Sequence, residues 1–308
     1  MEDKRRRVIE ELHKPARRTF ARRRVVIKGL HDLFQADLVE MIPYARFNKG
    51  FRYILVVIDA LSKYVWMEPV KRKTGIDVYV AMKKVLQDTT PKNLQTDNGK
   101  EFYNKHFRDL MTKFNVNHYS TYSDVKASIV ERANRTLKSS MWKEFSAQGS
   151  YKWLGLLPII LKRYNTTVHR TTGYKPIDVN KTNSKIILKN RFDNRKVMDP
   201  KKPKYSVGSY VRISKHREAF TKGYTPNWST EVFQVAIVQH SNPTTYILVD
   251  SANRQIKGGF YEQQLQAVKY PDIYLVEKVL KRRGNQMYVK WLGLDKTNNS
   301  WINKTNVV

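Results

Sequence analysis

The stretch Gln95-Thr96-Asp97-Asn98-Gly99-Lys100-Glu101-Phe102 decides the fold class, because a strand end, an acidic turn and a helix start follow one another within it. Asp97-Asn98-Gly99 is a turn signal, and the residues from Phe102 to Phe114 follow a helical spacing. An acid at the carboxyl end of a strand lies where the active sites of α/β proteins are found. Asp97 is therefore the first candidate site residue.

The residues before this stretch predict three strands and then a helix. Strand patterns cover residues 33–41, 51–58 and 64–67. Their short connections indicate an antiparallel meander. The spacing of apolar residues becomes helical over residues 74–86.

The residues after it predict one more short strand and two long helices. The strand covers residues 117–120, and the helices cover residues 124–145 and 153–169. The resulting order β-β-β-α-β-α-β-α-α places helices on both sides of a sheet. An α/β layered domain is therefore expected over residues 31–180.

The rest of the chain divides by composition into four segments. A basic arm covers residues 1–30 and a basic linker covers residues 181–203. Short strand signals, separated by Gly and Pro, predict a small all-β barrel over residues 204–268. Two further short strands indicate a last all-β module over residues 272–308.

The net charge points to a polyanionic partner. The 308 residues include 58 Lys or Arg and 27 Asp or Glu, a net charge of +31. Residues 1–30, 31–180 and 181–308 carry +7, +10 and +14, so every part is basic and nucleic acid is the expected partner. The runs Arg5-Arg6-Arg7 and Arg22-Arg23-Arg24 fit a solvated arm, a DNA contact or a nuclear import signal.

Several function classes are excluded by what the sequence lacks. No run of about 18 apolar residues and no signal-peptide pattern occurs, so neither a membrane partner nor secretion is expected. Cysteine is absent, which excludes a disulfide framework, thiolate catalysis and a cysteine-containing zinc finger.

Acids inside strands or at strand ends need an explanation in so basic a chain, because a buried charge is costly. Carboxylates from different elements can hold two divalent cations such as Mg²⁺, which activate a hydroxyl and stabilise the leaving oxygen of a phosphodiester. Asp37 in the first strand, Asp97 and Glu131 in a polar helix are such acids. Spacing alone does not single them out, because other acids fit the same description: Asp59, Asp77, Asp109 and Asp124.

The helix that carries Glu131 is also a candidate DNA-contacting surface. Asn134, Arg135 and Lys138 stand three, four and seven residues after Glu131, so they share its face, and Lys126 precedes it. These residues are predicted to contact phosphates, which fixes position rather than sequence.

Three motifs choose among the acids. They are the segments 34–41 (FQADLVEM), 95–102 (QTDNGKEF) and 126–138 (KASIVERANRTLK). They resemble the D, D and E signatures of retroviral-type integrases, in order and within the predicted β/α succession. By this resemblance Asp37, Asp97 and Glu131 are both the catalytic residues and the metal ligands.

The likeness is closer to integrases of the Polinton/Maverick transposons and their virophage relatives, and it covers nearly the whole chain. Residues 11–18 resemble the segment before their catalytic domain, and residues 163–174 resemble the sequence after its last helix. Residues 222–229 and 259–265 resemble their SH3-like β-barrel.

This resemblance implies an RNase H-like catalytic core, a mixed five-stranded sheet with flanking helices. It implies two Mg²⁺ or Mn²⁺ ions, and 3′-end processing followed by strand transfer of a mobile element or virophage genome into host DNA. Double-stranded DNA, both element ends and target, and further copies of the chain, as a dimer or tetramer, are the implied partners. The host nucleus or a virus particle is the implied location.

The C-terminal segment resembles a chromodomain over residues 274–280, 289–294 and 300–301. Such domains hold methyl-lysine of histone tails in an aromatic cage by cation–π attraction. Tyr274 and Trp291 match two cage positions, whereas Leu294 stands where a third aromatic ring is usual. Two walls hold a quaternary ammonium less well than three, and the module is expected to be incomplete at Val308.

The front of the chain departs from the retroviral pattern, which has a His/Cys zinc domain before the core. No zinc site is predicted, because cysteine is absent and the seven histidines do not cluster. A chain that is incomplete at its N-terminus is therefore expected. Three alternatives to an active integrase of this group remain: a catalytically silent DNA- or chromatin-binding protein derived from such an element, an RNase H-type nuclease, and an LTR-retroelement integrase.

Overall fold

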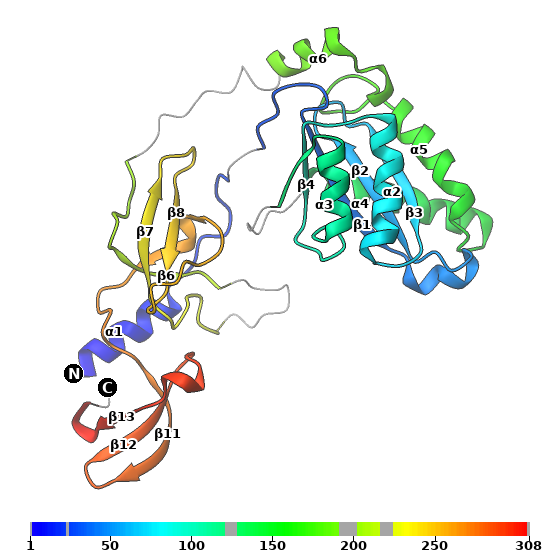
Figure 1. Cartoon of the computed structure of the whole chain (residues 1–308). Helices are drawn as coiled ribbons and strands as arrows, with labels where there is room; N and C mark the ends of the chain where they lie inside the picture. The colour runs from blue at the N-terminus through cyan, green and yellow to red at the C-terminus, as the bar shows by residue number, and fades with distance from the viewer. Residues whose placement is uncertain (1, 23–24, 121–127, 191–201, 216–223, 307–308) are drawn as a thin grey trace. The chain divides into compact units, whose positions relative to one another are not determined.

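The structure is a computed structural model that describes residues 2–22, 25–120, 128–190, 202–215 and 224–306. The chain separates into two compact units, drawn in Figure 1. One is Val25–Val197, and the other joins Met1–Arg24 to Met198–Val308. Among the described residues, no helix is long and apolar enough to cross a membrane.

The unit Val25–Val197 is built on a five-stranded sheet with the order β3-β2-β1-β4-β5. Its strands are β1 (Leu33–Glu40), β2 (Tyr53–Asp59), β3 (Val65–Val70), β4 (Asn93–Thr96) and β5 (Asn117–Ser120). The pairs β1–β2 and β2–β3 are antiparallel, whereas β1–β4 and β4–β5 are parallel. The predicted mixed sheet and its antiparallel meander are confirmed.

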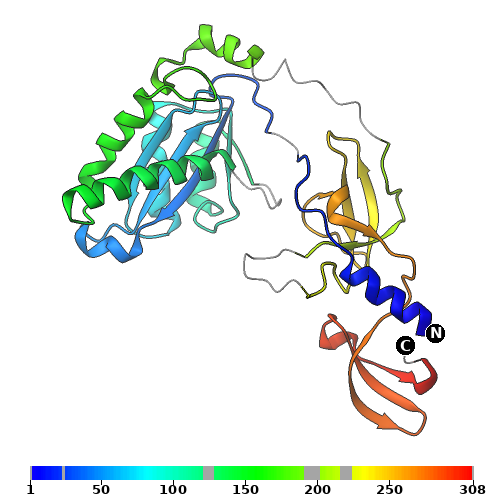
Figure 2. The same ribbon diagram turned by 180° about the vertical axis from the view of Figure 1, so that it is seen from behind.

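Helices cover both faces of this sheet, as Figures 1 and 2 show from opposite sides. Helices α2 (Gly75–Asp88) and α3 (Lys105–Lys113) pack on one face, and α4 (Ser128–Gln148) and α5 (Leu157–Thr166) pack on the other. The alternation of β1 explains both layers: Ala36 and Leu38 join the first core, and Val39 joins the second. Asp37 therefore stands on the α4 side of the sheet.

The largest difference from the sequence prediction in this unit lies in the segment 181–203. Its first part forms helix α6 (Lys181–Leu188), with Asn180 and Asn183 in a reciprocal capping box. Ile187 is buried against the edge of the core. The basic, Asn-rich composition indicated a linker, but a polar pair at the right spacing begins a helix here.

The second unit contains two antiparallel sheets. The first has the order β10-β6-β7-β8-β9. Its strands are β6 (Tyr210–Ile213), β7 (Phe233–Gln239), β8 (Thr245–Val249), β9 (Phe260–Tyr261) and β10 (Leu265–Ala267). The second sheet consists of β11 (Val276–Arg283), β12 (Gln286–Trp291) and β13 (Ser300–Asn303). Both lie where the sequence predicts small all-β modules.

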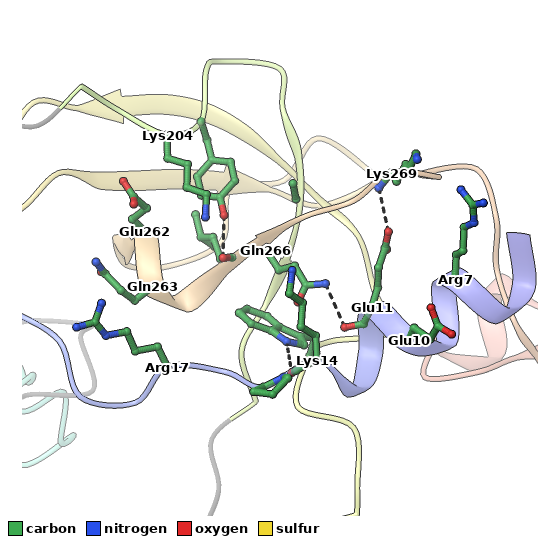
Figure 3. A pocket seen from close by; sticks show the side chains of 15 residues that line it. Arg7, Glu10, Glu11, Lys14, Arg17, Lys204, Glu262, Gln263, Gln266 and Lys269 are labelled. Atoms are coloured by element: carbon green, nitrogen blue, oxygen red, sulfur yellow. Dashed lines mark hydrogen bonds between the residues drawn. The ribbon is translucent and has the colours of Figure 1, made fainter.

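Helix α1 (Glu2–His13) lies in the segment predicted as a basic arm, and it packs on the first of these sheets. The last carbonyls of a helix lack partners within the helix, and here the barrel supplies them. The backbone N–H groups of Asn227 and Trp228 donate to the Leu12 carbonyl at 2.9 and 3.2 Å. Gln266 Nε2 donates to the Glu11 carbonyl at 3.1 Å (Figure 3).

Beside this junction lies a hollow of about 850 Å³, which Figure 3 shows from close by. Trp228 and Lys14 both line this hollow, and the Trp228 indole N–H donates to the Lys14 carbonyl at 2.8 Å. Hydrogen bonds therefore join the N-terminal segment to the barrel.

Candidate active site

Asp37 lies in the second half of β1, and two protein donors fix its carboxylate. The Leu38 backbone N–H donates to Oδ1 at 2.8 Å, and Asn134 Nδ2 of α4 donates to Oδ2 at 2.7 Å. Asn134 is only 7% exposed, so this amide is committed to the carboxylate. Each carboxylate oxygen still has a free lone pair.

Asp97 directly follows β4, the parallel neighbour of β1. Gln35 pairs with Gln95 in the parallel register, so Asp37 and Asp97 both stand two residues further along their chains. The Gly99 backbone N–H donates to Asp97 Oδ1 at 3.1 Å. This turn holds the Asp97 carboxylate at the end of the strand.

Glu131 lies in the first turn of α4, and the start of that helix is fixed by the sheet. Gln35 Oε1 accepts from the backbone N–H groups of Ile129 and Val130 at 2.9 and 3.1 Å. Gln35 Nε2 donates to Gln95 Oε1 at 2.9 Å. One buried amide therefore ties β1, β4 and the N-terminus of α4 together and sets where Glu131 stands.

The three carboxylates interact electrostatically. Burial raises the pKa of Asp37, and the negative charges of Asp97 and Glu131 raise that pKa further. The Leu38 N–H and the Lys138 ammonium act in the opposite direction. The carboxylates of Asp97 and Glu131 therefore lie near enough to Asp37 to act on its charge.

The donor set fits a divalent cation by its chemistry. Carboxylate oxygens are the ligands that Mg²⁺ and Mn²⁺ prefer, and Asp37, Asp97 and Glu131 supply them. The Oδ1 atom of Asn134, whose Nδ2 donates to Asp37, is a buried oxygen without a hydrogen-bond partner among the described residues. Over the described ranges, however, no three His, Cys, Asp or Glu side chains are grouped closely enough to form a ready metal site.

The residues predicted to contact DNA are placed differently from one another. Arg135 and Lys138 are exposed on α4, on the helix that carries Glu131. Asn134 is buried and bonded to Asp37, as described above. Lys126 lies outside the described residues.

Sequence reasoning missed Gln35 and the ion pair between Lys73 and Glu101. Lys73 Nζ lies 3.1 Å from Glu101 Oε1. The hydrogen bond to Glu101 raises the pKa of Lys73 most, and the charge of Asp97 adds to it. Signals for both features were present: Gln35 is a polar residue two positions before Asp37 in an apolar strand, and Glu101 follows Asp97 by four.

The two predicted cage residues of the C-terminal module lie near each other. The ring centroids of Tyr274 and Trp291 are 6.0 Å apart, with an interplanar angle of 63°. They line a hollow of about 330 Å³ together with Leu294 and with Glu231 of the barrel. The Trp291 indole N–H donates to Ser300 Oγ at 3.0 Å, which fixes that ring.

The sequence of the core is similar to those of known integrases and transposon-derived proteins. Residues 31–122 match the family described as "Integrase core domain". A putative uncharacterized transposon-derived protein of Caenorhabditis elegans is 36% identical over 207 residues, which covers 67% of this chain and 68% of that protein. The Gag-Pol polyprotein of woolly monkey sarcoma virus is 33% identical over 153 residues, which covers 47% of this chain but 9% of the polyprotein.

Among solved structures, a chain of the simian T-cell lymphotropic virus intasome in complex with PP2A regulatory subunit B56 gamma has a similar fold. The match covers 82% of this chain and 83% of that one, with a TM-score of 0.55 and 17% identity. It includes the α/β core and all-β parts, so the predicted fold class is confirmed.

The fold and the family match define the class of protein: an integrase-type α/β core with attached all-β modules. The chain belongs to the family of proteins that carry a retroviral-type integrase core, with retroviral and transposon-derived members. Its function is of the integrase or transposase type.

Proposed function

We propose that this chain is a polynucleotidyl transferase that processes the 3′ ends of a mobile DNA element and transfers them into a target duplex. The observation that carries the proposal is geometric: Asp37 and Asp97 stand at matching positions of two parallel neighbouring strands, and Gln35 holds the start of the helix that carries Glu131 beside them. Each of these acids comes from a different element, and each sits within its own motif.

In this proposal the chain's residues have separate tasks. Asp37, Asp97 and Glu131 would hold two Mg²⁺ or Mn²⁺ ions, which when bound would supply Lewis acidity to a phosphodiester and activate the attacking hydroxyl. Asn134 orients Asp37 through its 2.7 Å hydrogen bond. The exposed cations Arg135 and Lys138 neutralise phosphates beside the carboxylates, and Lys126, outside the described residues, is assigned the same task.

The partners follow from the chemistry. Strand transfer joins element ends to a second duplex, so the chain must handle two duplexes and acts as a homo-oligomer, a dimer or tetramer. The net charge of +31 supports a DNA partner. The place of action is the host nucleus, or the virus particle for a virophage-encoded chain.

Two origins of the element are in competition. The likeness of residues 11–18, 163–174, 222–229 and 259–265 favours a Polinton/Maverick or virophage element. The 33% identity to a retroviral polyprotein favours an LTR retroelement. The neighbouring genes decide: a protein-primed polymerase and capsid genes support the first origin, and an upstream reverse transcriptase supports the second.

For the C-terminal module we propose a chromodomain-like role in which Tyr274 and Trp291 receive a cationic side chain, such as methyl-lysine of a histone tail. The basis is the pair of rings 6.0 Å apart beside a hollow. Binding of a trimethyl-lysine peptide that survives in Trp291→Ala would contradict this role.

A strand-transfer assay tests the main proposal. The full chain is incubated with a duplex that carries a candidate terminal repeat and a supercoiled plasmid, in Mg²⁺ or Mn²⁺. We expect covalently joined product with the wild type and only background with Glu131→Gln. Glu144→Gln is the matched control, because Glu144 lies on the same helix but pairs with Arg163.

The same assay distinguishes an active integrase from a catalytically silent DNA-binding protein. DNA binding without joining, in either metal and on every end sequence tried, would support a catalytically silent DNA-binding protein. Equal product from the wild type and Glu131→Gln would remove Glu131 from the site.

A further inference from the structure

A buried carboxylate lies next to Asp97 without being one of the three motif acids. Glu101 is 6% exposed and stands in the loop between β4 and α3. A buried charge is expensive unless it is paired, and Lys73 Nζ lies 3.1 Å from its Oε1. Lys73 precedes α2, so the pair connects the loops that lead into two neighbouring helices (Figure 1).

The Glu101 carboxyl group also packs directly on Gly99. A Cβ atom added to Gly99 would lie 2.5 Å from Glu101 Cδ, so no larger residue fits while Glu101 keeps its place. The Gly99 N–H is the donor to Asp97 Oδ1. Contacts therefore run without a break from Lys73 through Glu101 and Gly99 to the Asp97 carboxylate.

A second contact joins the same two loops. The Asn104 carboxamide presses on Gly75, where an added Cβ would lie 2.5 Å from Asn104 Cγ. Asn104 Nδ2 donates to the Glu101 carbonyl at 2.8 Å, and Asn104 Oδ1 caps α3 by accepting from Phe107 N–H at 3.0 Å. The Asp97 loop is therefore held at two points.

We infer that Lys73 and Glu101 are positioning residues that hold the Asp97 loop, and with it the Asp97 carboxylate, in place for a divalent cation. The inference rests on the proposed role of Asp97. Glu101 itself faces Gly99 and Lys73, so it acts through the loop. A residue of this kind, which orients a metal ligand, typically changes metal affinity about 10- to 100-fold when it is lost.

Mn²⁺ binding to the full chain, measured by calorimetry, tests the inference without relying on turnover. We expect Glu101→Gln and Lys73→Met each to weaken Mn²⁺ binding about 10-fold or more, and Lys73→Arg to restore most of it. Strand transfer should lose activity at low Mn²⁺ and recover at saturating Mn²⁺. Lys84→Met is the matched control, because it removes the 2.9 Å ion pair between Lys84 of α2 and Glu68 of β3 and should leave Mn²⁺ binding unchanged.

A suppressor experiment tests the contact with Gly99. Gly99→Ala should weaken Mn²⁺ binding because its methyl group collides with the Glu101 carboxyl group. In the Glu101→Ser background the collision is gone, so adding Gly99→Ala should have little further effect. Lys73 is partly exposed, so Lys73→Met remains usable if thermal denaturation shows that a Glu101 variant is unfolded.

The two ideas fail in different ways. If Asp97→Asn binds Mn²⁺ as tightly as the wild type, the proposed role of Asp97 is wrong. If Asp97→Asn loses Mn²⁺ binding while the folded Lys73 and Glu101 variants keep it, the positioning role is overturned and the role of Asp97 stands.

Discussion

At the scale of single residues, the surroundings of Asp37 determine the charge state and the orientation of its carboxylate. Its carboxylate sits in a partly buried strand and accepts hydrogen bonds from Leu38 and Asn134. Burial and the charges of Asp97 and Glu131 raise its pKa. The site therefore stores like-charge repulsion, and groups kept for function at the expense of stability are common in active sites.

This repulsion predicts that Glu131→Gln makes the core more stable while it abolishes strand transfer. Removing one of three like charges should raise the melting temperature of the core by about 1–2 °C in a buffer with a metal chelator. Differential scanning calorimetry measures the change. The matched control Glu144→Gln should not raise it, because Glu144 is paired with Arg163, and a fall in melting temperature for Glu131→Gln would contradict the electrostatic account.

His118 gives the core a defined pH dependence. It lies on β5 with Nε2 2.9 Å from Thr96 Oγ1 and its ring centroid 4.8 Å from that of Tyr103 and 5.2 Å from that of Phe107. Burial lowers its pKa from 6.5 to about 4. The folded state therefore keeps His118 neutral at a pH where the unfolded chain already binds the proton.

As the pH falls, His118 of the unfolded chain gains its proton before His118 of the folded core does. The contribution of His118 to stability is therefore full above about pH 6.5 and falls as the pH drops toward 4. We expect the core's melting temperature to fall between pH 7 and pH 5, and to fall less in His118→Gln, which does not titrate. An identical fall in both proteins would show that His118 is not the group responsible.

At the scale of elements, Gln35 determines where α4 begins. Its amide satisfies two N–H groups of the first helical turn and also bonds Gln95. The residue that caps α4 stands 94 positions before Ile129, so the sequence around α4 does not reveal its cap.

Gln35→Leu should lower the free energy of unfolding of the core by about 2–4 kcal/mol, because it leaves two helix N–H groups without their acceptor and removes the hydrogen bond to Gln95 Oε1. Urea denaturation measures this change. Gln87→Leu on the exposed side of α2 is the matched control and should change stability by less than about 0.5 kcal/mol. A Gln35→Leu variant as stable as the wild type would contradict the capping role.

The strands could be predicted because they depend on local patterns, and local motifs also selected the three acids, whose role stays a prediction. Alternating or continuous apolar residues set β1 to β3, and Asp97 and Glu131 are marked by motifs. The parts that escaped prediction depend on distant partners: Glu101 needs Lys73, and α4 needs Gln35. Helix α6 escaped because its cap consists of two Asn residues in a polar segment.

At the scale of the whole molecule, α1 is part of the C-terminal unit rather than of the core. Its composition is dominated by charges, so the sequence indicated a basic arm. Val8 and Leu12 are nevertheless 1% and 3% exposed, one turn apart on one face of the helix. Arg212 of β6 is also buried, and its guanidinium donates to the carbonyls of Ser229 and Thr230 at 2.9 and 2.6 Å.

Leu12→Ala should therefore destabilise the C-terminal unit by about 2–4 kcal/mol, the range for a buried leucine. Calorimetry of the full chain should show that the transition of this unit shifts while the transition of Val25–Val197 stays in place. Ile9→Ala is the matched control and should have a much smaller effect, because Ile9 is 40% exposed. If the transition of Val25–Val197 shifts instead, α1 stabilises the core, and its assignment to the C-terminal unit is contradicted.

The basic charge predicts a strong salt dependence of DNA binding. The affinity should fall with salt by about 0.9 logarithmic units per tenfold increase for each phosphate contact. The double variant Arg135→Ala, Lys138→Ala should make this slope shallower by about 1.8, the equivalent of two phosphate contacts. Fluorescence anisotropy with a labelled duplex measures the slope, and an unchanged slope would remove these residues from the DNA surface.

The central claim is that three acids from β1, the β4 turn and α4 act as one site for joining DNA. The most direct measurement is the time course of covalent joining of a labelled 3′ end to plasmid in Mn²⁺, for the wild type and for Asp37→Asn, Asp97→Asn and Glu131→Gln. We expect joined product with the wild type alone, and for all three variants an amount of product no higher than the same background. A near-wild-type rate in any folded one of the three would contradict it.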